Sequence, residues 1–180
     1  MLCPPVMPRV ISSATGDTIP VEGVLLEVEA GSAGAIELVG GHGTGKTTAL
    51  THLADVTPRD RNILFLDDAE TERIAQAAAG ALVVFTSLSP RLVPNSISYR
   101  LAPWGDDELI EYLMAVHPDQ CRSVMARLRA AADPHLPGGN PELWRIVLDQ
   151  MAQNESLTGA CETLRYNLAS RMPREDVRSR

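Results

Sequence analysis

The chain has 180 residues, a formal net charge of −7 and a hydrophobic fraction of 44%. This length suits one domain, or one core with a helical appendage, and it is long enough to bury a sizeable core. The acidic balance argues against a general nucleic-acid binder or a membrane-surface binder, because both favour basic faces. Only 4% of the residues are aromatic, so the core must be built mainly from Leu, Val, Ile and Ala.

The cysteines and the apolar runs indicate in which cellular compartment the protein is expected. Cys3, Cys121 and Cys161 are odd in number and far apart, which predicts reduced thiols and not a disulfide frame or a zinc site. No apolar run approaches the roughly 20 residues that a membrane helix needs. The N-terminus lacks the basic region and the long apolar stretch of a signal peptide. We therefore expect a cytoplasmic protein without a membrane partner.

The first half of the chain alternates between strand and helix patterns. Residues 1–20 are rich in Pro, Ser, Thr and Gly, and we expect them to be loosely ordered. Residues 21–29 alternate apolar and polar side chains, which predicts a half-buried strand that pairs as a hairpin with the next strand, 35–39. The elements predicted after it are a helix over 45–56, a fully buried strand over 62–68, a helix over 70–79, a buried strand over 81–86, a loop over 87–96 and a short strand over 97–101.

Beyond Pro103 the pattern becomes helical only. The predicted helices span residues 106–116, 118–132, 141–153 and 156–170, and residues 171–180 form a tail. Alternating strands and helices predict parallel strands joined by right-handed crossovers. The sequence thus predicts an α/β fold, with a three-layer core and a reduced parallel sheet over residues 21–103, followed by a helical lid over 104–170.

A phosphate-binding pattern, G-x-x-x-x-G-K-[ST], follows the predicted strand 35–39. Its residues are Gly40, Gly41, His42, Gly43, Thr44, Gly45, Lys46 and Thr47, and Thr48 continues the expected nucleotide site. The glycines let successive N–H groups point at an anion, and the next helix adds the positive end of its dipole. Lys46 would reach the outer phosphates, while the Thr47 hydroxyl would complete the shell of a magnesium ion. The strand before and the helix after distinguish this pattern from an ordinary glycine-rich turn, and they predict binding of a nucleoside triphosphate.

Acidic residues after the strand 62–68 are candidates for hydrolysis, which needs a carboxylate for magnesium and a group that positions water. Asp67 ends that strand at the sheet edge where ligands collect, so we assign it to magnesium, directly or through water. Asp68 or Glu70 would then orient the attacking water. The alternative is that these acids only stabilise the start of the next helix.

Further candidates follow along the chain. Thr86 and Ser87 end the next strand, where they would touch the terminal phosphate or simply begin the loop. Arg91 and Arg100 are candidates to stabilise charge in the transition state, although most arginines on loops and strand edges are only solvated.

In this order the residues resemble the AAA+ and STAND group of P-loop ATPases. The segment 40–47 looks like their Walker A motif, 63–68 like Walker B and 82–86 like the sensor-1 strand. Residues 99–113 look like the last strand and the first lid helix, and 138–141 like the sensor-2 region, where Pro141 would lie near the adenine. The resemblance covers residues 34–153 approximately. It implies a Mg-dependent ATPase whose slow hydrolysis switches a conformation.

Two departures from that group leave other interpretations open. Lys46 and Asp67 are only 21 positions apart, where the group usually has another strand and helix between its motifs. In addition, Glu142 stands where related ATPases carry an arginine, with Arg145 one helical step beyond. The short spacing is similar to that of small-molecule and nucleotide kinases, in which Asp67 or Asp68 would bind the acceptor. A third interpretation is a nonhydrolytic nucleotide-binding module, with a protein partner or self-association through the helical half.

Strand order distinguishes the first two interpretations. The AAA+ resemblance places the strand 82–86 between the phosphate-loop strand 35–39 and the acid-bearing strand 63–67. In many small kinases the acid-bearing strand lies directly beside the phosphate-loop strand.

Overall fold

The structure, a computed structural model, describes residues 4–29, 34–131 and 138–171. The chain divides into two compact units, Met1–Pro103 and Trp104–Arg180. The first unit is α/β, and the described residues of the second form helices joined by turns, with no strand among them. The α-helices are α1 (Gly23–Glu29), α2 (Lys46–Val56), α3 (Thr71–Ala78), α4 (Asp106–Val116), α5 (Cys121–Ala130), α6 (Pro141–Gln153) and α7 (Ala160–Arg171).

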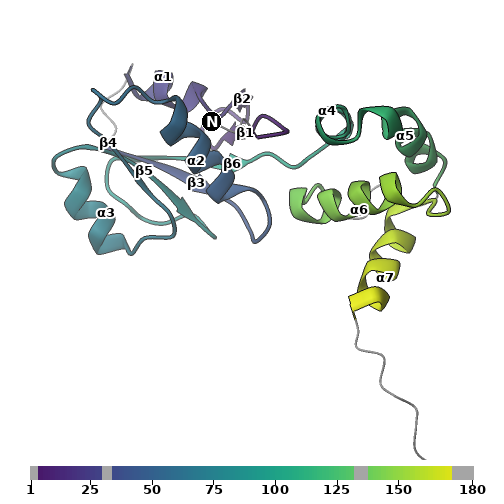
Figure 1. The fold of residues 1–180 in the computed structure, drawn as a ribbon. Helices are drawn as coiled ribbons and strands as arrows, with labels where there is room; N and C mark the ends of the chain where they lie inside the picture. The colour runs from purple at the N-terminus through teal and green to yellow at the C-terminus, as the bar shows by residue number, and fades with distance from the viewer. Residues whose placement is uncertain (1–3, 30–33, 132–137, 172–180) are drawn as a thin grey trace, which may run out of the picture. The chain divides into compact units, whose positions relative to one another are not determined.

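The first unit is built on a six-stranded mixed sheet with the order β2-β1-β6-β3-β5-β4 (Figure 1). The strands are β1 (Arg9–Ser12), β2 (Thr18–Pro20), β3 (Ala35–Val39), β4 (Ile63–Leu66), β5 (Leu82–Ser87) and β6 (Ser96–Leu101). The four strands from β3 to β6 are parallel to one another, as the alternating pattern predicts. β1 is antiparallel to both of its neighbours, so the sheet is mixed and not purely parallel.

Two predictions for the N-terminal region are wrong. Residues 9–20, predicted to be loosely ordered, contain β1 and β2, and Val10 of β1 is completely buried. The strand predicted over residues 21–29 is the helix α1, so no hairpin with β3 forms. The buried residues Val21, Val24 and Leu25 recur at spacings of three and four, which suit one face of a helix. The alternation in the same segment was therefore coincidental.

Helices cover both faces of the sheet. α1 and α2 lie on one face and α3 on the other (Figure 1). Because successive side chains of a strand point to opposite faces, Ile36 packs in one core cluster with Leu53 of α2, while Ala35 packs in the other with Ile74 of α3. This produces the three layers that the sequence predicts.

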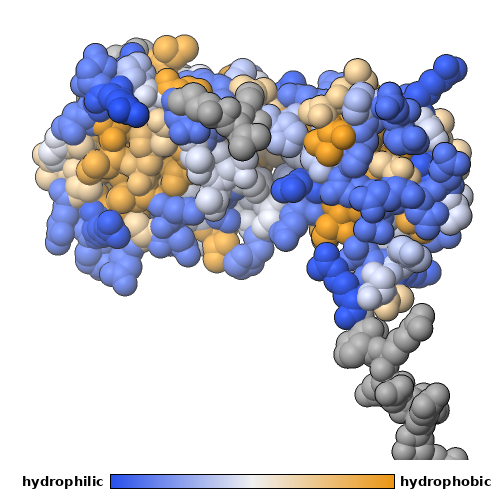
Figure 2. Space-filling view, in the orientation of Figure 1, coloured by the Kyte–Doolittle hydropathy of each residue, from blue (hydrophilic) through white to orange (hydrophobic). Residues whose placement is uncertain are grey.

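The acid-bearing strand β4 ends the sheet. The sequence predicted a fully buried strand here, and this prediction is wrong: Leu64 is 43% exposed and its neighbours in the strand are only half-buried. In the described residues β4 pairs with β5 alone, since the chain between α2 and β4 supplies no further strand. Figure 2 accordingly shows an apolar area on the part of the first unit where Figure 1 draws β4 and β5.

The second unit contains a helix in each predicted place, but α7 begins at Ala160, four residues after the start of the helix predicted over 156–170. α4 and α6 have the predicted bounds, whereas the helix predicted over 118–132 divides into a 3-10 turn, Pro118–Gln120, and α5. The Asn140 side chain caps α6 by accepting the N–H groups of Glu142 and Leu143 at 3.0 and 3.2 Å. In the described part of the chain, no helix has the length and apolar character needed to cross a membrane.

Candidate functional site

The phosphate pattern forms a tight loop between β3 and α2. Gly43 and Gly45 have φ angles of 72° and 88°, in the left-handed region that glycine enters without steric cost. Gly40 is needed for a different reason, because a Cβ there would lie 2.4 Å from the Oγ1 of Thr44. Gly45 is the N-cap of α2, so the first turn of this helix directly continues the loop.

Lys46 lies over this loop. Its Nζ donates to the carbonyl oxygen of Gly41 at 2.8 Å, and the Thr44 hydroxyl donates to the same oxygen at 2.9 Å. Lys46 is also the single lysine among the 180 residues, every other basic side chain apart from histidine being arginine. The only flexible primary ammonium side chain of the protein is therefore at the end of the loop 40–47.

The structure brings Asp67 to the start of α2. The Thr47 hydroxyl donates to Asp67 Oδ2 at 2.8 Å, and the Thr86 hydroxyl donates to Asp67 Oδ1 at 2.5 Å. The three residues come from α2, from the end of β4 and from β5. Both carboxylate oxygens are thus oriented by hydroxyl groups of neighbouring elements.

Asp68 and Arg91 meet beside Asp67. The backbone N–H of Asp68 donates to the Thr86 hydroxyl at 2.8 Å, and its φ of 47° is unusual for a residue other than glycine. The guanidinium of Arg91 lies 3.4 Å from Asp68 Oδ1 and donates to the carbonyl of Ala69. The sequence made Arg91 a candidate to stabilise charge in the transition state. In the structure its guanidinium contacts the turn formed by Asp68 and Ala69.

The remaining candidates are placed individually. The backbone carbonyl of Ser87 accepts the N–H of Gly40, the first residue of the loop, at 3.1 Å. The Ser87 hydroxyl donates to Glu37, on the α3 side of the sheet, because Thr86 and Ser87 are successive strand residues and point to opposite faces. The Ser87 hydroxyl is thus engaged on the opposite face from Thr86, and a contact of Ser87 with the terminal phosphate stays a prediction. Glu70 is exposed at the N-cap of α3, and Arg100 is exposed opposite Val39 in the β3–β6 register. Pro141 is a buried residue at the start of α6 in the second unit, so its role beside an adenine stays a prediction.

The donor set fits a magnesium ion. Mg²⁺ is usually bound through one or two protein groups together with substrate phosphates and water. Thr47 and Asp67 provide a hydroxyl and a carboxylate 2.8 Å apart at the end of the loop 40–47. Within the residues that the structure describes, no cluster of three or more His, Cys, Asp or Glu side chains could hold a metal ion.

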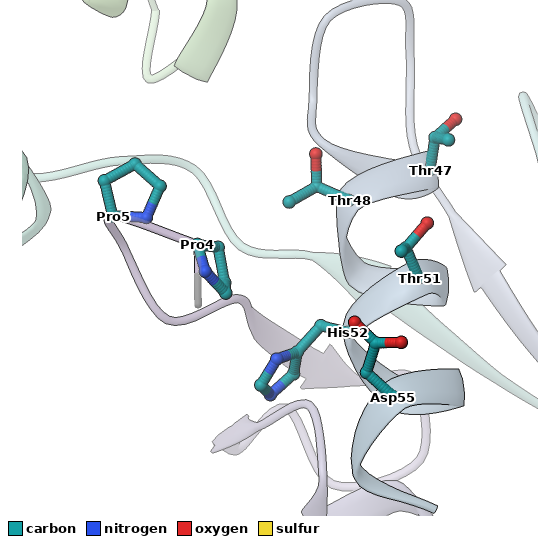
Figure 3. A pocket seen from close by; sticks show the side chains of 7 residues that line it. All are labelled: Pro4, Pro5, Thr47, Thr48, Thr51, His52 and Asp55. Carbon is teal, nitrogen blue, oxygen red and sulfur yellow. The ribbon is translucent and has the colours of Figure 1, made fainter. Parts of the chain in front are cut away.

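A pocket of about 290 Å³ opens beside the loop (Figure 3). Its lining comes from the N-terminal segment and from one side of α2, namely Pro4, Pro5, Thr47, Thr48, Thr51, His52 and Asp55. Pro4 and Pro5 face the helix across the pocket, and the buried His52 is hydrogen-bonded to Glu22 at the start of the α1 region. Sequence analysis missed this pocket, although Thr48, Thr51 and Asp55 recur at helical spacing.

No protein-family model matches the chain, and no curated protein matches it either. The chemistry of the site is therefore argued from its own residues.

Proposed function

We propose that the chain binds a nucleoside triphosphate with magnesium through the loop 40–47, and that it hydrolyses the triphosphate slowly as a conformational switch. The observation that carries this proposal is the hydrogen bond between Thr47 and Asp67, which are 20 positions apart in sequence. It joins a phosphate-loop hydroxyl to a carboxylate at the carboxyl end of β4, where ligands of open α/β sheets collect.

Each part of the loop has a role in this proposal. Backbone N–H groups and the start of α2 bind the phosphates, and Lys46 turns from the Gly41 carbonyl to the outer phosphates. Thr47 and Asp67 would hold magnesium, which when bound would supply positive charge to the phosphate oxygens. Asp68 orients the attacking water, and Thr86 fixes the carboxylate of Asp67 through its hydroxyl.

The pocket beside α2 supports a place for the nucleoside. It shares Thr47 and Thr48 with the start of the helix, so a ligand held at the loop can extend directly into it. Proline rings supply an apolar wall, while Thr51 and Asp55 supply polar groups for hydroxyls or amines. Adenine as the base rests on the resemblance to the AAA+ and STAND group.

Strand order favours this proposal over a small-molecule kinase. β5 lies between β3 and β4, which is the order that the AAA+ resemblance predicts. A kinase of the kind considered would place β4 directly beside β3. The acid-bearing strand is instead the outermost strand of this edge.

The test is phosphate release from Mg-ATP together with equilibrium binding of ATP, measured on the parent chain and two variants. Lys46→Ala should weaken ATP binding about 30- to 100-fold, because a charge-assisted bond to phosphate is lost. Asp67→Asn should keep ATP binding and lose magnesium-dependent turnover. Equal ATP affinity in Lys46→Ala and the parent would refute the phosphate-loop assignment, and binding without turnover in the parent would favour the nonhydrolytic module.

A further inference from the structure

The turn after β4 is held in an uncommon conformation. Asp68 has a φ of 47°, and only one other described residue besides the glycines, Asn95, has a positive φ. Such a conformation persists where the surroundings over-determine it, and it is often found at functional sites. Here three contacts fix the turn: Asp68 N–H to the Thr86 hydroxyl at 2.8 Å, Arg91 to Asp68 Oδ1 at 3.4 Å, and Arg91 to the carbonyl of Ala69.

Arg91 is itself anchored at the centre of the sheet. Its backbone N–H donates to Glu37 Oε1 at 2.9 Å, and Glu37 on β3 is completely buried. The same carboxylate accepts the Ser87 hydroxyl at 2.8 Å and the Ser98 hydroxyl at 2.5 Å. Because a buried carboxylate is tolerated only with its hydrogen bonds made, this anchor resists displacement of Arg91.

In the β5–β6 loop, exposed and inward-facing residues alternate around Arg91. Its neighbours Pro90 and Leu92 are exposed, Leu92 completely, whereas the Arg91 side chain is only 28% exposed. Arg91 is therefore turned inward between two exposed residues, and Val93, two positions further on, is buried in the core cluster that contains Ala69. Its planar guanidinium binds a backbone carbonyl and a carboxylate together, which the single ammonium of a lysine cannot do with the same geometry.

These contacts form a ring that is closed by the backbone from Glu37 through the loop 40–47 to Thr47. Starting from Thr47, the ring passes through Asp67, Thr86 and Asp68 to Arg91 and Glu37. Glu37 lies in β3, which leads directly into Gly40. The ring thus connects the first turn of α2 to β3 by way of Asp67 and Asp68.

We propose that Arg91 is a positioning residue, which holds Asp68 in its left-handed conformation from the β5–β6 loop and so sets the rate of hydrolysis without touching the nucleotide. This inference rests on the proposed function. It gives the β5–β6 loop a specific task, since a shift of that loop would move the water-orienting carboxylate.

The first measurement compares steady-state Mg-ATP hydrolysis by the parent, Arg91→Ala and Arg91→Lys. Arg91→Ala should lower kcat about 10- to 100-fold, because small misplacements of a positioning group cost that much. KM and the Kd for ATP should stay within about twofold, since the phosphate loop is untouched. Arg91→Lys should recover only part of kcat, because one ammonium cannot hold Ala69 and Asp68 together.

A double-mutant cycle separates positioning from a general structural effect. In an Asp68→Asn background, which keeps a residue tolerant of the left-handed region, Arg91→Ala should change kcat by less than about twofold. If Arg91→Ala lowers kcat by the same factor in both backgrounds, Arg91 does not act through Asp68 and the inference is wrong. A loss of ATP affinity equal to the loss of kcat would overturn it as well.

Hydrogen exchange provides a readout that needs no turnover. In Arg91→Ala, amide hydrogens in the peptide that contains Asp68 should exchange about fivefold faster or more, because the hydrogen bond from the Asp68 N–H to the Thr86 hydroxyl is loosened. The exchange rate of the peptide covering residues 40–47 should be unchanged. If hydrogen exchange at Asp68 is the same in Arg91→Ala and in the parent, the inference is wrong, even if the parent hydrolyses ATP. Absence of ATP binding by the parent would instead refute the proposed function, with the exchange result still deciding whether Arg91 positions Asp68.

Discussion

At the level of single residues, Gly40 and Gly41 differ in the space that a side chain would have at each position. An alanine Cβ at position 40 would lie 2.4 Å from Thr44 Oγ1 and 3.3 Å from Thr44 Cβ. At position 41 the nearest atom would be Thr44 Cγ2 at 4.0 Å, which is an ordinary contact. The loop is therefore closed most tightly where it leaves β3.

We expect Gly40→Ala to lower the free energy of unfolding by about 1–3 kcal/mol, the usual cost of forcing an extra methyl into a packed site. Gly41→Ala is the matched control and should stay within about 0.5 kcal/mol of the parent. Denaturant titration of both variants without nucleotide measures the difference. Equal stabilities would mean that Thr44 simply turns away, and that the loop is looser than described.

Tyr112 gives a second residue-level prediction, in the second unit. Burial raises the pKa of Tyr112 above its usual value, and a hydrogen bond to Asp149 at 2.9 Å adds to the rise, against an opposing effect of Arg145. The folded state thus favours the protonated phenol. Its contribution to stability is present below the unfolded pKa of about 10 and is lost as the pH rises through the folded pKa.

Tyr112→Phe should therefore cost about 1 kcal/mol at pH 7, the typical worth of a hydrogen bond. The gap in unfolding free energy between parent and variant should narrow as the pH rises above about 10. Denaturant titrations at neutral and alkaline pH check the prediction. A gap that stays constant over that range would contradict the assigned environment of the hydroxyl.

Sequence alone predicted the turn between β3 and α2 and the place of Asp67 directly after β4, because both follow from local spacing. The binding of phosphate by this loop stays a prediction. Sequence alone missed Glu37, which stands in an otherwise apolar strand and whose burial depends on hydroxyls from β5 and β6. It also could not distinguish Thr86 from Ser87, since which of two successive residues faces the loop depends on the register of the finished sheet.

At the level of elements, the least expected feature is the N-terminal strand β1. It pairs antiparallel with β6, and Val10 within it is completely buried in the core cluster that also contains residues of α2. β1 thus extends the parallel sheet on the side opposite β4.

If β1 belongs to the cooperative core, Val10→Ala should destabilise the protein by about 2 kcal/mol through lost burial and a residual cavity. Val56→Ala offers a matched control, since Val56 is 46% exposed at the end of α2. The control should change the free energy of unfolding by less than about 0.5 kcal/mol. Equal effects of the two substitutions would argue that β1 is not part of the core.

Helices and strands could be predicted from the sequence where a single hydrophobic periodicity, helical or strand-like, dominates. The bounds of α4 and α6 followed from apolar residues at helical spacing and from Pro141 at the first helical position. The segment 21–29 is compatible with the periodicity of a strand and with that of a helix. It forms a helix because its apolar residues pack against β2 and the core. The exposure of β4 depends on which strands flank it, which no local pattern encodes.

At the level of the whole molecule, the proposed function makes nucleotide a stabiliser of the first unit. A ligand that binds only the folded state raises the free energy of unfolding by about 2.7 kcal/mol at 100 times its Kd. Mg-ATP should give such a rise in the parent and not in Lys46→Ala. A rise of equal size in both would show that any stabilisation comes from elsewhere in the chain.

The most direct test of the account uses Lys46, the single lysine of the chain. The parent is treated with an amine-acylating reagent with and without saturating Mg-ATP, and modification at Lys46 is followed by mass spectrometry, with an added lysine-containing peptide as reference. If the Lys46 ammonium moves onto the outer phosphates, Mg-ATP should slow its acylation about tenfold or more while the reference is unaffected. Acylation of Lys46 at the same rate with and without Mg-ATP would contradict the central claim that this loop holds a nucleoside triphosphate.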